Sequence, residues 1–105
     1  MTSFILHALP TQGRSLVPDT DHLLASVRPA QLLLINLLPG EYPFESHDNP
    51  EYLVCLRGTL MLEDEHGVQI RAELGEMVEV CPGVRHRFAP QADAVILTVA
   101  QSNGV

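Results

Sequence analysis

The clearest hydrophobic pattern lies in the second half of the chain. Over residues 68–74, apolar Val, Ile, Ala and Leu alternate with Gln, Arg and Glu, which is the period of a β-strand with one buried face. Apolar runs follow at residues 77–81, 84–89 and 94–100. The first three of these four segments end at a glycine or proline, residues that commonly turn the chain. We therefore predict four short strands here.

The middle of the chain predicts two further strands and a hairpin turn. Residues 51–57 and 59–63 are apolar-rich runs separated by Gly58, so we expect one strand to end at this glycine and another to begin after it. Residues 64–67 are Asp-Glu-His-Gly. This is turn chemistry, because Gly67 can adopt the positive φ that hairpin turns require.

The N-terminal part is less regular. Residues 2–9 predict a short strand, residues 11–20 a loop, and residues 21–28 either a strand or a short helix cut off by Pro29. Residues 31–38, QLLLINLL, predict a strand. Its apolar side chains face both ways, which implies burial on both faces, in a sandwich core or against a second subunit.

Together these segments predict eight to ten short strands, with a turn signal every 8 to 12 residues and no sustained helical period. That pattern is typical of an all-β sandwich or barrel. The length of 105 residues suits one domain spanning residues 1–105.

Composition limits which partners and which compartment we expect for the protein. The formal net charge of −7 makes nucleic acid and anionic lipid surfaces poor partners, since both would be repelled. No apolar run is long enough to cross a bilayer, and the first residues lack the basic and apolar regions of a signal peptide. Two cysteines do not make a disulfide framework. We expect a cytoplasmic protein.

Chemistry-bearing residues crowd into residues 40–58, which contain Glu45, His47 and Glu51, and His86 follows later. Strand alternation places Glu45 and His47 on one face of an extended segment. If the inward faces of a closed roll meet, all four side chains converge. Two imidazoles with one carboxylate suit Fe(II), and a second carboxylate would favour harder ions such as Mn or Fe.

Two arginines need a separate assignment because they could bind an anionic group. Arg85 and Arg87 flank His86. Alternation puts them on the opposite face of the strand from His86, where we expect them to meet solvent or a partner subunit.

The spacing of these residues resembles the two motifs of the cupin superfamily, G-x5-H-x-H-x3-4-E-x6-G over residues 40–58 and G-x5-P-x-G-x2-H-x3-N over residues 75–90. His47, Glu51 and Gly58 match the first motif, and Gly75, Gly83 and His86 match the second. The resemblance implies a double-stranded β-helix, the jelly-roll or cupin barrel of small RmlC-like proteins. It also implies that His47, Glu51 and His86 ligate one divalent metal in the barrel mouth.

The chain departs from the family pattern at several positions. Glu45 stands where cupins have the first histidine, Cys81 stands in the proline slot, and Pro90 replaces the final asparagine. Glu45 matters most because it changes the ligand set. It could be a fourth ligand or simply face solvent, and the four residues could instead form a metal-free hydrogen-bonded cluster.

The resemblance implies a divalent metal (Fe, Mn, Ni or Zn) and a small oxygen-rich organic ligand, with a metal-dependent dioxygenase or isomerase among the possible activities. The alternative is a metal-free binding or sensor module without catalysis. It would hold a small organic acid or sugar in an apolar pocket lined by Leu53, Met61, Val78, Phe88 and Ile96. We also expect a homodimer, formed through residues 1–30 and the apolar strand at residues 32–38.

Overall fold

The computed structural model describes residue 3 and residues 5–101, which form one short helix and seven strands. These elements are α1 (Leu9–Arg14), β1 (His22–Val27), β2 (Ala30–Leu37), β3 (Glu51–Asp64), β4 (Gln69–Ala72), β5 (Met77–Val80), β6 (His86–Phe88) and β7 (Asp93–Gln101). The predicted all-β class is confirmed, although the described residues hold seven strands rather than eight to ten. None of the described residues forms a helix that is long and apolar enough to cross a membrane.

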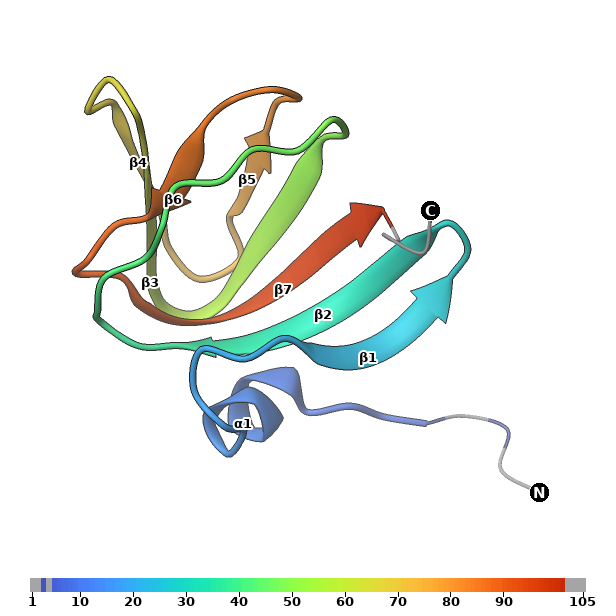
Figure 1. Cartoon of the computed structure of the whole chain (residues 1–105). Coiled ribbons are helices and arrows are strands. Elements are labelled where there is room, and N and C mark those ends of the chain that lie inside the picture. The colour runs from blue at the N-terminus through green and yellow to red at the C-terminus, as the bar shows by residue number, and fades with distance from the viewer. Residues whose placement is uncertain (1–2, 4, 102–105) are drawn as a thin grey trace.

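Strand β3 connects the two parts of the roll. Its first half pairs with β5 and β7, and its second half pairs with β4 and β6, always in antiparallel fashion. Strands β7, β2 and β1 extend the sheet outward from β3. In Figure 1 this curved sheet lies below β4, β5 and β6, and β3 bends from the lower layer to the upper one.

The expectation that Gly58 separates two strands is wrong, because β3 runs through it without interruption. The strand pairing with β7 shifts by one residue between Cys55 and Arg57, which marks a β-bulge. Gly58 follows with φ of 76°, a left-handed conformation that glycine adopts without steric cost. The bulge and the glycine bend β3 so that one strand serves both layers.

The N-terminal expectations also need correction. Residues 2 and 4 of the predicted 2–9 strand lie outside the described residues, and residues 5–8 carry no strand. Helix α1 occupies the start of the predicted 11–20 loop. Proline is tolerated in the first turn of a helix, so Pro10 does not prevent it. Gly13 lets α1 approach β7, since a Cβ there would collide with the Val95 methyl groups.

Strand β2 is buried on both faces, as predicted. Four consecutive residues, Leu34 to Leu37, are buried, and consecutive residues of a strand face opposite sides. One of them, Asn36, donates hydrogen bonds to the carbonyl oxygens of Arg14 and Leu16 and accepts one from the Arg14 guanidinium. The end of α1 and the loop after it therefore cover this face. The open choice for residues 21–28 resolves as strand β1.

We predict that Gly58→Ala lowers the free energy of unfolding by roughly 2–4 kcal/mol, because it adds left-handed strain and a clash with the backbone carbonyl of Asp93. Gly67→Ala is the matched control, since Gly67 has a similar φ of 82° and no atom within 4 Å of a built Cβ. It should cost about 1 kcal/mol. Urea denaturation measures both variants, and equal losses would contradict the role given to Gly58.

Candidate metal centre

Backbone hydrogen bonds bring the two motif regions together. Glu45 and His86 form an isolated antiparallel bridge, in which the Glu45 N–H donates to the His86 carbonyl at 2.8 Å and the His86 N–H donates to the Glu45 carbonyl at 2.9 Å. The Gly83 N–H donates to the His47 carbonyl at 2.8 Å. These bonds fix the loop between β2 and β3 against the start of β6, and so they position Glu45 and His47 beside His86.

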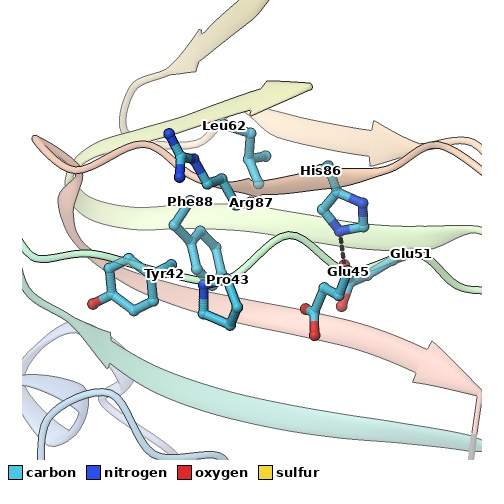
Figure 2. Close-up of a pocket in the computed structure, with 8 residues that line it drawn as sticks. All are labelled: Tyr42, Pro43, Glu45, Glu51, Leu62, His86, Arg87 and Phe88. Carbon is cyan, nitrogen blue, oxygen red and sulfur yellow. Dashed lines mark ion pairs between the residues drawn. The ribbon is translucent and has the colours of Figure 1, made fainter. Parts of the chain in front are cut away.

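The structure brings three of the four expected side chains into one group, and the fourth, Glu51, contacts one of them. One ligand atom from each of Glu45, His47 and His86 lies within 4.8 Å of the other two. Glu51, at the start of β3, joins them through its Oε1, which lies 3.4 Å from the His86 Nε2. The His47 Nε2 lies 3.6 Å from the Glu45 Oε1. Figure 2 shows Glu45 and Glu51 close to the His86 ring, with the Glu51–His86 ion pair dashed.

The four side chains differ in depth. His86 and Glu51 are deep in the roll, with side chains 6% and 18% exposed. His47 and Glu45 lie at the rim, with side chains 40% and 57% exposed. Glu45 is therefore open to solvent, and its carboxylate also faces His47.

A backbone carbonyl fixes the orientation of His86. The His86 Nδ1 lies 2.8 Å from the Val84 carbonyl oxygen, which can only accept, so Nδ1 carries the proton and donates. The Nε2 is left facing the carboxylates. The hydrogen bond with Glu51 raises the pKa of His86 above its ordinary value of 6.5, while burial opposes this rise. A histidine whose Nδ1 is held by a carbonyl while its Nε2 faces other potential ligands is a common arrangement around protein-bound metals.

Two cavities meet at this group. The smaller one, of about 120 Å³, is closed by Tyr42, Pro43, Leu62, Arg87 and Phe88 and reaches Glu45, Glu51 and His86 (Figure 2). The larger one, of about 520 Å³, opens beside Glu45, His47 and Glu51. A ligand entering the larger cavity would therefore meet Glu45, His47 and Glu51, while His86 lines the smaller cavity beside them.

The expected lining of the apolar pocket is largely wrong. Leu53, Val78 and Ile96 are buried members of the hydrophobic core, and Met61 packs against that core. Only Phe88 of the five lines the larger cavity. The other apolar walls come from β2 and β7, namely Leu33, Ile35 and Ala100, with the hydroxyl-bearing Thr98 among them. Alternation did not single these residues out, because β2 is apolar on both faces.

The flanking arginines do not enter the larger cavity. Arg87 donates to the Glu63 carboxylate at 2.8 Å and lies over the Phe44 ring at 4.4 Å, and it contributes to the wall of the smaller cavity. Arg85 pairs with Glu65 at 3.8 Å. Both guanidinium groups are thus paired with acidic side chains outside the larger cavity.

The donor set suits a divalent ion. Atoms that ligate one ion at about 2.1 Å lie roughly 3–4 Å from one another, and the His86–Glu51 and His47–Glu45 separations of 3.4 and 3.6 Å fall in this range. Two carboxylates would balance the charge of a divalent ion. Imidazole and carboxylate together suit Fe, Mn, Ni and Zn. The residues present therefore fit a bound metal.

Comparison with known families identifies the class of protein. The family model described as "Cupin domain" matches residues 33–100, which is more than half of the chain. The chain therefore belongs to the cupin domain family, and its all-β roll is the double-stranded β-helix of that family. The resemblance drawn from the two motifs is confirmed.

Solved structures support the same fold. A cupin-2 domain containing protein from Shewanella frigidimarina is similar, with a TM-score of 0.80, 19% identity, and coverage of 92% of this chain and 94% of that one. An RmlC-like cupin with a double-stranded β-helix fold from Methanocaldococcus jannaschii is also similar, with a TM-score of 0.69 and 18% identity. The match covers 85% of this chain and 84% of that one. The structure of Fe(II) HppE in complex with substrate has a TM-score of 0.66 and 19% identity. The match covers 80% of this chain and 54% of that one. No curated protein sequence matches the chain significantly.

We predict that Glu51→Gln lowers the pKa of His86 in the metal-free protein, because the Glu51 carboxylate is the main cause that raises it. Since the folded-state pKa is the higher one, the pair stabilises the metal-free protein fully below pH 6.5. This stabilisation is lost as the pH rises through the folded-state pKa. NMR titration of the His86 ring measures the shift in wild type and variant. Identical titration curves would contradict the assignment.

Proposed function

We propose that the protein is a small cupin that binds one divalent metal ion through His47, Glu51, His86 and Glu45, and that it binds or acts on a small oxygen-rich organic ligand beside the ion. The observation that supports this most strongly is the grouping of Glu45, His47 and His86, with Glu51 paired to His86, beside the 520 Å³ cavity that Glu45, His47 and Glu51 line. These side chains come from three segments of the chain and are positioned by backbone hydrogen bonds.

Electrostatics favours a bound cation. Glu45 and Glu51 are both close to His86, and each contributes to raising its pKa. Two carboxylates held near one another repel unless a proton or a cation lies between them. In the metal-free protein a proton on His86 reduces this repulsion, and a divalent ion would do so more completely.

The expected chemistry follows from the positions of the side chains. A bound divalent ion would polarise an oxygen atom of the ligand. His86, oriented by the Val84 carbonyl, and Glu51 would hold the ion from the inside of the roll. His47 and Glu45 would hold it from the solvent side, and the cavity would admit the ligand between them. HppE, the similar structure with Fe(II) and substrate, gives support for iron among the candidate ions.

One observation favours the metal-free alternative, a binding or sensor module without catalysis. The His86 ring is already fully paired within the protein, through Val84 at Nδ1 and Glu51 at Nε2. A hydrogen-bonded cluster of this kind can orient side chains around a ligand without an ion. Ligand stabilisation that is equal in wild type and His47→Ala would favour this alternative.

We predict that His47→Ala and His86→Ala each weaken metal binding by about a hundredfold or more, because each removes one nitrogen ligand. The measurement is metal content after purification with Fe, Mn, Ni or Zn supplied, together with titration of the metal-free protein. His66→Ala is the matched control, since His66 lies on the exposed turn after β3, and it should bind metal as the wild type does.

Glu45→Gln, made in the same series, tests whether Glu45 is a ligand, since cupins have a histidine at this position. We expect it to weaken binding, as we expect of Glu51→Gln, because the proposal has both carboxylates ligating the same ion. Wild-type affinity in Glu45→Gln would remove Glu45 from the ligand set. If the wild type contains no stoichiometric metal with any of Fe, Mn, Ni or Zn supplied, the proposal is contradicted.

The proposal includes a cytoplasmic homodimer. Strand β1 pairs only with β2 among the described residues, and its Leu23 and Val27 are 62% and 68% exposed. An unpaired edge with apolar side chains is a natural surface for a second copy. We predict a dimer by light scattering and a monomer for Val27→Glu. Val68→Glu is the control at a similarly exposed valine, 64%. A monomeric wild type at micromolar concentration would contradict the prediction.

A further inference from the structure

The larger cavity carries an unusual charge distribution. Four carboxylates line it, from Asp21, Glu45, Asp48 and Glu51, and no arginine does. The chain has no lysine, so its permanently charged basic side chains are six arginines, beside five histidines. Four of these are paired with acidic side chains elsewhere, in the pairs Arg14–Asp93, Arg71–Glu73, Arg85–Glu65 and Arg87–Glu63. Among the described residues, the cavity therefore offers an anionic ligand no arginine, and its imidazole, His47, already lies beside the Glu45 carboxylate.

One buried hydroxyl that lines the cavity has no hydrogen-bond partner among the described residues. Thr98 is only 2% exposed and lines the cavity, and its Oγ1 has no hydrogen-bond partner within the described part of the chain. Its neighbours across the sheet are Leu33 and Leu53, which offer only apolar side chains. A buried hydroxyl without a partner is unfavourable. This hydroxyl is available to a polar atom that enters the cavity.

The rest of the floor is apolar. Leu33, Ile35, Phe88 and Ala100 surround Thr98 along the cavity wall. Asp21 and Asp48 are exposed, so they lie toward solvent. A ligand that fits this lining has a positive charge for the acidic rim, a short apolar skeleton for the walls, and one hydrogen-bonding atom for Thr98.

We propose that the cavity selects a small organic cation, an amine that also carries a hydroxyl group, over ligands bearing a carboxylate or phosphate. The inference rests on the proposed function, because it names the ligand class of the same site. The four carboxylates contribute up to −4 without metal, of which a proton on His86 offsets one, and a divalent ion in place of that proton leaves −4 + 2 = −2. The cavity therefore disfavours anions in both states, and Thr98 supplies the one directional contact on its floor.

The test uses three probes that share a three-carbon skeleton and one hydroxyl: 1-amino-2-propanol, 1,2-propanediol and lactate. They differ in charge at neutral pH, being cationic, neutral and anionic. Binding is followed by NMR through the methyl groups of Ala100 and Ile35, first in metal-free protein and then with Zn²⁺. We expect the amine to bind about tenfold more tightly than the diol, with lactate weakest, in the metal-free protein.

Two sets of variants separate the contacts. Thr98→Val removes the hydroxyl at nearly constant shape and should weaken the amine about tenfold, with the melting temperature unchanged or higher. A purely structural hydroxyl would instead lower the melting temperature. Thr59→Val is the control, since the Thr59 hydroxyl bonds to Glu73 outside the cavity. Asp21→Asn and Asp48→Asn should each reduce the preference for the amine roughly threefold.

Three outcomes would overturn the inference: lactate binding as tightly as the amine in metal-free protein, amine binding unchanged in Thr98→Val, or no methyl shift with any probe at millimolar concentration. The metal-free measurement keeps this test apart from the proposed function. A protein that prefers the amine but binds no metal would retain this inference and lose the metal centre. A protein that binds metal without preferring the amine would retain the metal centre and lose this inference.

Discussion

The fold depends on one strand that belongs to both layers of the roll. Strand β3 pairs with four other strands, and it can do so only because it bends at the bulge before Gly58. Its first residue, Glu51, belongs to the candidate site, and its far end pairs with β6, which begins at His86. The bend therefore determines how close Glu51 and His86 come. A side chain at Gly58 would press on the β7 backbone at Asp93 and would disturb this geometry from a distance.

The site has a buried part, His86 and Glu51, and a solvent-exposed rim, Glu45 and His47. Different interactions hold the side chains of each part in place. His86 and Glu51 are buried and paired, so their positions are set by the fold itself. Glu45 and His47 lie on a loop, and three backbone hydrogen bonds to the region of His86 hold that loop in place. This division gives a physical reason for the substitution of the usual histidine by Glu45. A rim position is solvated, so it can carry a carboxylate without the desolvation cost that a buried charge would pay.

Much of the fold and of the candidate site could be predicted from the sequence, because both depend on local periodicity and spacing. Alternation located the strands after residue 68, and motif spacing grouped His47, Glu51 and His86. Gly58 shows a limit of prediction from the sequence, since a glycine with positive φ can either end a strand or bend it. Only the pairing of β3 with both layers shows that Gly58 bends the strand. Thr98 shows another limit. It is one polar residue in an apolar strand, and its unpaired hydroxyl becomes visible only once the neighbouring strands are in place.

The central claim is that Glu45, His47, Glu51 and His86 bind one divalent ion. An anomalous-scattering map from crystals grown with Zn²⁺ or Mn²⁺ tests it most directly. The account predicts a single strong peak about 2.0–2.2 Å from the Nε2 atoms of His47 and His86 and from oxygens of Glu51 and Glu45. A map without a peak at His86, or with ions bound only to exposed carboxylates such as Asp48, would contradict it.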